Sequence, residues 1–287
     1  MRYDVTHTTH YRYSESVLLS HHVARLSPRT LPHQTCLTHA LEIDPAPAVS
    51  RGHRDYHGND TTFFMMEGAH RELRVTARSR IDVATPPPPG PAAAQPWETA
   101  RDHEHLPLDV IEYVFESPAV RITEEVAHYA RASFPAGRPL VEAVTELMGR
   151  IHADFQFDAQ ATTVATPLAD VMQLRRGVCQ DFSQLAVGCL RAMGLAARYV
   201  SGYIETLPPP GRPRLIGADA SHAWLAVYCP GEGWIDLDPT NNVLPGDQHV
   251  TLGWGRDYGD VSPLRGVMLG GGDHLLTVAV DVVRVDE

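Results

Sequence analysis

A run of prolines is the feature that most limits how this chain folds. Between Pro86 and Pro91 every residue except one glycine is proline, and three alanines follow. Proline lacks a backbone N–H and has a fixed φ, so this stretch fits neither a helix interior nor a central strand. We expect a stiff, polyproline-like spacer. It predicts a first domain over residues 1–85, a linker over 86–96 and a second domain over 97–287.

The part before the prolines has the pattern of strands. Over residues 72–83 apolar and polar side chains alternate, as in a strand with one wet face. Residues 3–13, 35–43 and 61–66 also favour extended structure, and turn residues separate them. The expected fold of residues 1–85 is a small β-sandwich.

After the linker, helices precede strands. Apolar residues at helical spacing predict helices over 123–132 and 141–155. Strands are predicted over 197–204 and 274–285. This order indicates an α+β fold.

Two later segments, 207–214 and 253–272, are long and have no regular pattern. They are interpreted either as the rim of a substrate cleft or as plain surface loops.

Cys179 lies between two predicted helices. The first starts at Thr166 and Pro167 and is expected to stop at Gly177. The second carries an apolar stripe from Phe182 onward, which places Cys179 at or next to its N-terminus. Unpaired N–H groups and peptide dipoles at that end favour a thiolate, the form that attacks a carbonyl carbon.

A base and a carboxylate follow on a predicted hairpin. His222 precedes the apolar strand 224–229, and the turn after it leads to a strand that ends near Pro239. A three-residue loop, Pro230 to Glu232, puts His222 and Asp238 on one face as diagonal neighbours. Asp236 would share that face nearer the turn, so Asp238 is the preferred partner of the imidazole.

Three segments in this order resemble the transglutaminase-like cysteine enzyme superfamily. They are Gly177-Val178-Cys179, Ser221-His222-Ala223-Trp224 and Gly233-Trp234-Ile235-Asp236-Leu237-Asp238-Pro239-Thr240. The resemblance covers roughly residues 120–287, and the first eighty-odd residues are similar to the β-rich N-terminal domain of bacterial members. It implies a papain-like α+β core over residues 97–287, with Cys179 as nucleophile, His222 as general base and acid, and Asp238 as the orienting carboxylate.

The oxyanion of the tetrahedral intermediate also needs donors. The backbone N–H of Cys179 is an obvious one. Gln173, six residues before Cys179, resembles the glutamine of papain-like proteases, although it falls inside a predicted helix.

The implied reaction is acyl transfer on a peptide or carboxamide bond through a thioester. Hydrolysis, as by a peptidase or amidase, is the first interpretation, and protein-glutamine or small-amine transglutaminase is the alternative among enzymes. A non-catalytic protein-binding module is the alternative outside them. Bacterial proteins that this chain resembles are often linked to amide-forming ligases, which adds such a ligase as an expected functional partner.

The remaining cysteines and histidines have simpler interpretations. Cys36, Cys189 and Cys229 fit structural positions, since free cysteine commonly packs as a small apolar residue. The chain has 16 histidines but neither Cys-x-x-Cys nor His-Glu-x-x-His, and no acidic loop of EF-hand type. No metal and no cofactor are expected.

The composition limits the kinds of molecule that this chain is expected to bind. The net charge of −11, without a basic cluster, argues against nucleic acid. All 24 basic residues are arginine, so the chain has no lysine to serve as its own acyl acceptor. No signal peptide and no membrane-spanning run is apparent, which predicts a cytoplasmic protein, and four cysteines without framework spacing predict no disulfide. The substrate that the resemblance implies is a peptide or protein amide. The oligomeric state is left open.

Overall fold

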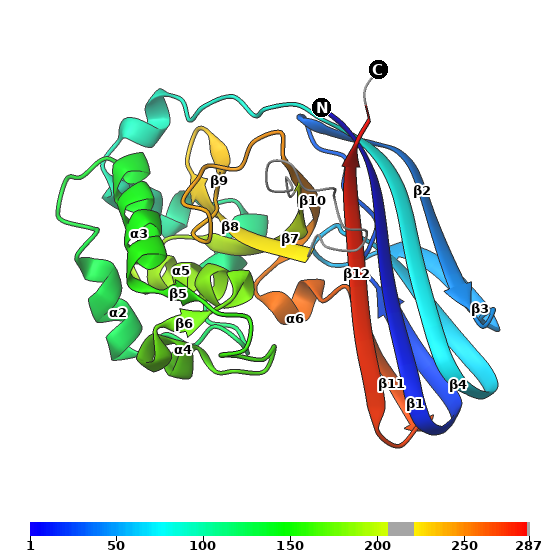
Figure 1. Ribbon diagram of the computed structural model, residues 1–287. Coiled ribbons are helices and arrows are strands. Elements are labelled where there is room, and N and C mark those ends of the chain that lie inside the picture. Colours follow the sequence, from blue (N-terminus) through cyan, green and yellow to red (C-terminus); the bar gives the residue numbers. More distant parts are fainter. Residues whose placement is uncertain (206–220, 286–287) are drawn as a thin grey trace, which may run out of the picture.

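The computed structural model describes residues 1–205 and 221–285. They form a large bent β-sheet, a smaller four-stranded sheet, and a group of helices beside the smaller sheet (Figure 1). The expected α+β class is confirmed. The smaller sheet lies between the helices and the large sheet in this view.

The large sheet is antiparallel and six-stranded, in the order β11-β1-β4-β2, with β12 also paired to β1 and β3 to β4. Its strands are β1 (Arg2–Ala24), β2 (Gln34–Asp44), β3 (Val49–Arg54), β4 (Asp60–Val83), β11 (Leu264–Gly270) and β12 (His274–Arg284). The predicted alternation over residues 72–83 is present, since Leu73, Val75 and Ile81 are fully buried.

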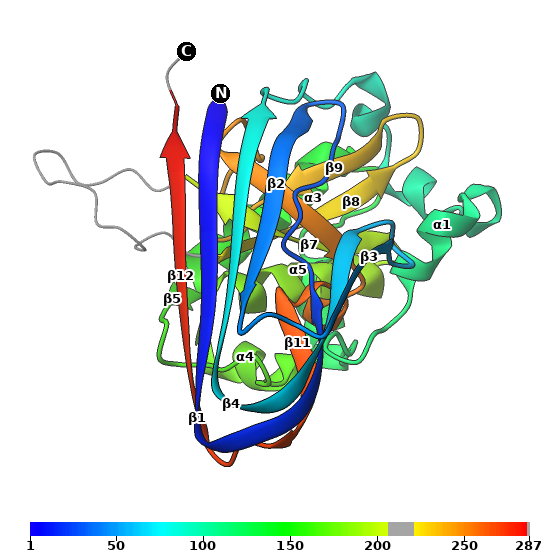
Figure 2. The ribbon, with the colours of Figure 1, turned by 90° about the vertical axis from the view of Figure 1, so that its right-hand side faces the viewer.

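The two longest strands of this sheet bend in the middle. The register between β1 and β4 shifts between Arg12 and Val17 and again before Leu19, and such shifts let a strand change direction. Figure 2 shows β1 descending along one side and turning at the lower end of the view. The expected β-sandwich is thus built from one bent sheet, with a core that includes Val17, Phe64 and Met66.

The C-terminal strands belong to this same sheet, which departs from the expected division of the chain. The prediction gave residues 97–287 to the second domain, yet β12 pairs with β1 from Tyr3 opposite Arg284 to Tyr13 opposite His274, and β11 pairs with the rest of β1. Alternation of apolar residues predicts a strand without naming its partner. The strand itself was correctly predicted, but its sheet was not.

The smaller sheet has the order β10-β7-β8-β9. Its strands are β7 (Ala197–Ile204), β8 (Ser221–Cys229), β9 (Gly233–Leu237) and β10 (His249–Gly255), and a short parallel pair is formed by β5 (Gln156–Phe157) and β6 (Arg176–Gly177). Leu225 and Val227 of β8 face the helices and share one apolar core with them.

The helices supply most of that core. The longer ones are α2 (Glu124–Arg131), α3 (Leu140–Asp154), α4 (Leu168–Leu174) and α5 (Cys179–Ala192), and the short ones are α1 (Leu108–Ile111), α6 (Tyr258–Val261) and the 3-10 turns η1 (Pro91–Ala94), η2 (Trp97–Arg101), η3 (His103–His105) and η4 (Glu112–Val114). Nearly every residue of α5 is buried, so this helix is the centre of the layer.

Two expectations about irregular segments change. Residues 253–272 are not a loop, because they contain the end of β10, α6 and β11. Residues 207–214 lie outside the described part.

The linker is also partly folded: η1 lies within it, Ala93 is fully buried, and the backbone N–H of Ala92 donates to Glu232 at 3.0 Å. Among the described helices, none is long and apolar enough to cross a bilayer.

Candidate active site

Cys179 occupies the first position of α5, as the sequence predicts. The turn before it is fixed by Asp181, whose carboxylate accepts hydrogen bonds from the backbone N–H of Val178 at 2.8 Å and from the hydroxyl of Thr162 at 2.7 Å. A carboxylate at this position satisfies an N–H that the helix leaves unpaired. The half-buried Cys179 therefore stands at a rigid helix N-terminus.

The sequence predicts that Gly177 ends the preceding helix, but in the structure it has a different role. Helix α4 ends at Leu174, and the capping residue after it, Arg175, adopts a left-handed φ of 52°. Gly177 is buried beside Asp181, and a Cβ atom there would lie 2.5 Å from Asp181 Oδ2. Only glycine lets the chain approach the capping carboxylate this closely.

The hairpin has the predicted register. Leu225 pairs with Leu237 and Cys229 with Gly233, which leaves a three-residue loop. Extending this register puts Asp238 opposite Trp224 and diagonal to His222. The expected geometry of the two side chains is confirmed.

His222 lies between Cys179 and Asp238. Its Nε2 is 2.7 Å from Asp238 Oδ2, and its ring lines the same cavity as the Cys179 side chain. Because Nε2 faces the carboxylate, Nδ1 is the nitrogen left for the thiol. Burial alone would lower the pKa of His222, but the hydrogen bonds and charges of Asp238 and Cys179 outweigh it and raise the pKa to about 9. The imidazole is held as a cation beside sulfur.

Asp238 is fully buried and accepts hydrogen bonds at both oxygens. Oδ2 also receives His249 Nε2 at 3.1 Å and Asn241 Nδ2 at 2.7 Å, and Oδ1 receives the backbone N–H groups of Thr240 and Asn241 at 3.0 and 3.2 Å. Burial opposes its charge, but the bonds from His222 and His249 outweigh burial and keep its pKa well below the usual range. Asp238 remains a carboxylate.

His249 and Asn241 were not identified from the sequence. His249 begins β10. The backbone N–H of Gly246 donates to its Nδ1 at 3.4 Å, so the ring proton is on Nε2, which donates a hydrogen bond to Asp238. The contact depends on the pairing of β10 with β7, for which no local motif exists. The Asn241 contact is local, and an asparagine three residues after an Asp in a turn is the signal that could have indicated it.

Two other predicted candidates lie elsewhere. Asp236 sits nearer the turn, where burial raises its pKa and Arg198 is its main charged neighbour. Gln173 is exposed on α4 and does not line the cavity at Cys179. Its helix turns that position to the surface, which corrects the expectation of an oxyanion donor there. Gln180, by contrast, follows Cys179 directly and does line the cavity.

A cavity of about 390 Å³ opens at the Cys179 and His222 side chains. The large sheet forms one wall through residues of β1 and β12, namely His7, Thr9, Tyr11, Leu276 and Val278. None of its described lining residues is Asp, Glu, Lys or Arg. Burial lowers the pKa of His7 to about 4, so this wall is neutral near pH 7. The cavity therefore favours uncharged groups around the thiol.

The described residues include one donor set for a metal ion. The donor atoms of His222, Asp238 and His249 lie within 4.8 Å of one another. However, both Nε2 atoms are at hydrogen-bonding distance from the same oxygen, Asp238 Oδ2. This arrangement is that of N–H donors on a carboxylate rather than of lone pairs aimed at a common centre.

Comparison with known families gives two matches. Residues 3–82 match the bacterial transglutaminase-like N-terminal region, and residues 127–239 match the transglutaminase-like superfamily. Cys179, His222 and Asp238 all fall within the second match.

Relatives extend over nearly the whole chain. The Mycobacterium tuberculosis protein Rv2569c is 45% identical over 291 residues, which cover 98% of this chain and 92% of the relative. A Pseudomonas aeruginosa protein-glutamine gamma-glutamyltransferase is 30% identical over 128 residues, which cover 38% of this chain and 19% of that enzyme.

Among solved structures, a Cytophaga hutchinsonii protein described as a candidate cysteine protease has a TM-score of 0.77 at 18% identity, covering 100% of this chain and 92% of that one. It shares the fold. The match to the transglutaminase-like superfamily supports a cysteine-based acyl-transfer activity. The chain belongs to the transglutaminase-like superfamily, with the N-terminal region of its bacterial members.

Proposed function

We propose that this protein hydrolyses a carboxamide or peptide bond through a thioester on Cys179. The observation that carries the proposal is the position of His222, which lines the same cavity as Cys179 and is hydrogen-bonded to the buried Asp238. Such a chain of nucleophile, base and orienting carboxylate is the general arrangement of covalent acyl transfer.

The steps follow from this geometry. The Cys179 thiolate attacks the carbonyl carbon, and the oxyanion that forms lies near the backbone N–H of Cys179 at the start of α5. The C–N bond breaks as the His222 imidazolium protonates the departing amine. Water then attacks the thioester, His222 takes its proton, and the C–S bond breaks to release the acid and restore the thiolate.

Access and lining support hydrolysis of an uncharged group. Cys179 is half-buried at the edge of the cavity rather than sealed behind it, so water reaches the sulfur. Apolar side chains such as Leu276 and Val278 flank that position. The substrate we propose is a peptide amide whose acyl side carries neutral, apolar neighbours.

The first test is alkylation by iodoacetamide as a function of pH, with mass spectrometry to identify each modified cysteine. Cys36 is also half-buried and lies on β2, so it is an internal reference. We expect Cys179 to react much faster than Cys36 near neutral pH and to lose that advantage in His222→Ala. Equal rates at the two cysteines would refute the catalytic role and favour a binding module.

The second test identifies the acceptor. Apolar peptides that end in a carboxamide are incubated in H₂¹⁸O with or without excess methylamine. The molecular masses of the products are then measured by mass spectrometry. A ¹⁸O-labelled acid in both reactions supports hydrolysis. A methylamide as the main product would show amine transfer, the alternative that the gamma-glutamyltransferase relative favours. Cys179→Ala should give neither product.

A further inference from the structure

A second cavity, of about 730 Å³, lies beside the smaller sheet and shares no lining residue with the active-site cavity. Side chains alternate between the faces of a strand, and on β7 Tyr199 and Ser201 line the active-site cavity whereas Arg198 and Val200 line this one. The volume falls in the range of about 300–1,000 Å³ that is usual for small-molecule sites. We call it the distal cavity, defined by Arg29, Tyr113, Arg198, Trp234, Asp236 and Trp254.

Arg198 is the unusual group in the distal cavity. It is only 9% exposed, and its Nε–H has no hydrogen-bond partner among the described residues. Its guanidinium carbon lies 3.7 Å from the ring centre of Trp254 and 4.2 Å from that of Trp234. Ring faces hold a guanidinium by cation–π attraction but do not satisfy its N–H groups. A buried donor left unpaired is unfavourable, because it has lost its hydrogen bonds to water without replacement.

Arg29 fixes the position of Trp254 in the wall of the distal cavity. Arg29 lies 3.6 Å from the ring centre of Trp254, and at that distance it occupies the face opposite Arg198. Arg29 is itself fixed, because it donates to Asn59 Oδ1 at 2.7 Å. Trp254 is therefore a rigid platform between two cations.

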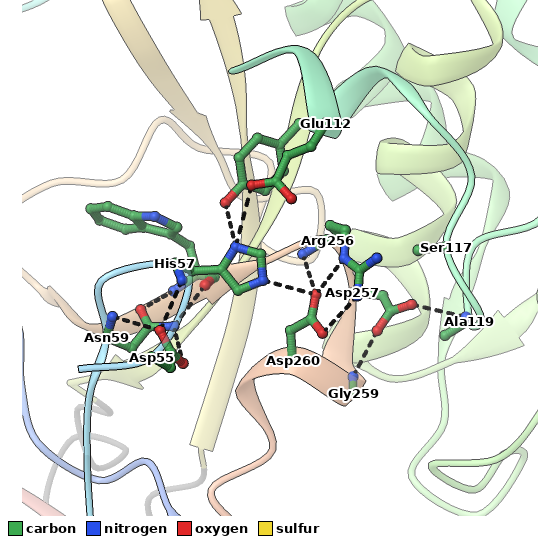
Figure 3. A network of polar contacts seen from close by, with 12 residues as sticks. Asp55, His57, Asn59, Glu112, Ser117, Ala119, Arg256, Asp257, Gly259 and Asp260 are labelled. Atoms are coloured by element: carbon green, nitrogen blue, oxygen red, sulfur yellow. Dashed lines mark hydrogen bonds and ion pairs between the residues drawn. The ribbon is translucent and has the colours of Figure 1, made fainter. Parts of the chain in front are cut away.

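Two acidic groups at one side of the cavity, Glu112 and Asp260, already have partners. Figure 3 shows His57 between Glu112 and Asp260. His57 Nε2 is 3.2 Å from Asp260 Oδ2, and its Nδ1 is 2.9 Å from the Tyr113 hydroxyl and 3.6 Å from Glu112. Asp260 also binds Arg256 at 2.9 Å. These carboxylates are thus engaged away from Arg198.

Asp236 is the acid that remains near Arg198. Its charge acts on the guanidinium, but no ion pair within 4.0 Å joins the two among the contacts of the described residues. No hydrogen bond among the described residues engages the two terminal nitrogens of Arg198, Nη1 and Nη2, so these are left for an acceptor oxygen. Asp109, Asp236 and Glu112 line the same cavity and oppose a group with two negative charges.

We propose that the distal cavity binds a small monocarboxylate that carries a flat apolar group. The carboxylate accepts from the terminal N–H groups of Arg198, a charge-assisted hydrogen bond. The flat group packs against Tyr113 and the edges of Trp234 and Trp254, because the two arginines cover the faces of Trp254. This site is separate from the catalytic cavity and does not depend on the proposed hydrolysis.

Benzoate is the probe, and benzamide is its matched control because the two differ only in the charged group. Calorimetric titration of the full chain should show benzoate binding roughly tenfold or more tighter than benzamide, the factor expected for one charge-assisted hydrogen bond. Arg198→Met should abolish this preference. Leu31→Trp, which fills the cavity from another segment of its lining without touching the arginine, should abolish binding.

A further control separates this site from the catalytic one. Cys179→Ala should bind benzoate as the wild type does, and this result stands whether or not the protein proves to be a hydrolase. Benzoate and benzamide binding equally, or benzoate binding that survives both Arg198→Met and Leu31→Trp, would overturn the proposal. So would tighter binding of inorganic phosphate than of benzoate.

Discussion

Gly177 touches the carboxylate that caps the nucleophile's helix: a Cβ atom on residue 177 would lie 2.5 Å from Asp181 Oδ2. The same oxygen accepts the Val178 N–H at 2.8 Å, one residue before Cys179. The absence of a side chain at residue 177 therefore decides how the first turn of α5 is closed and where the thiol points.

Gly177→Ala should damage both stability and reactivity. The added methyl group forces Asp181 away from Val178, and overpacking of this kind costs typically about 1–3 kcal/mol. We expect a lower free energy of unfolding in urea and slower alkylation of Cys179. Gly52→Ala is the matched control, because its Cβ would meet nothing closer than 3.9 Å. A Gly177→Ala protein as stable and reactive as wild type would contradict this account of the turn.

Asp238→Asn should reduce turnover by roughly 10²–10⁴-fold with little change in KM, by analogy with the loss of the orienting carboxylate in other triads. The amide keeps the shape but loses the charge that stabilises the His222 cation. Asp236→Asn makes the same change two residues away on the same strand face, where the side chain does not contact His222. Comparing the hydrolysis rates of the two variants shows whether Asp238 or Asp236 is the carboxylate that orients His222. If Asp236→Asn loses more activity, the assignment of the carboxylate is wrong.

His249 acts through Asp238 and should behave as a positioning residue. Its Nε2–H lies 3.1 Å from the oxygen that also receives His222. His249→Leu removes this donor and should lower kcat about tenfold, the effect of losing roughly 1–2 kcal/mol of orientation. His249→Gln keeps a donor and should recover most of the rate. A purely structural role predicts that both variants lose stability and activity in parallel, which melting curves would reveal.

The hairpin was predictable because all of its determinants are local. Alternation, the turn residues 230–233 and the parity of the loop fix the faces of His222 and Asp238 without reference to the rest of the chain. The position of Cys179 on α5 follows in the same way from one apolar stripe. Local patterns thus sufficed for the three central residues.

Most of the predictions that failed concern contacts between residues that are distant in sequence. The pairing of β12 with β1 joins residues more than 260 positions apart, from Tyr13 opposite His274 to Tyr3 opposite Arg284, and no pattern within either strand names the other. The contact of His249 with Asp238 has the same origin, since it requires β10 to lie beside β7. Gln173 failed for a different reason. Its spacing from Cys179 resembled a known arrangement, but α4 turns that residue to the surface.

The raised pKa of His222 gives a pH dependence with a definite sign. Its pKa rises from 6.5 to about 9 in the folded protein, so the folded state binds this proton more tightly than the unfolded chain. The stabilisation, on the order of a few kcal/mol, is complete below pH 6.5 and is lost as the pH rises to about 9. The difference in Tm between wild type and His222→Gln should therefore shrink across that interval.

Cys179→Ala tests the origin of this shift. Both Asp238 and Cys179 contribute to the raised pKa of His222. Without the thiol, the His222 imidazole followed by NMR should titrate at a lower pH than in wild type, though its hydrogen bond to Asp238 remains. Cys189→Ala is the control, because that thiol is fully buried on the inner side of α5. Identical His222 titrations in wild type and Cys179→Ala would mean that sulfur and imidazole do not share a proton, and the proposed thiolate–imidazolium pair would have to be abandoned.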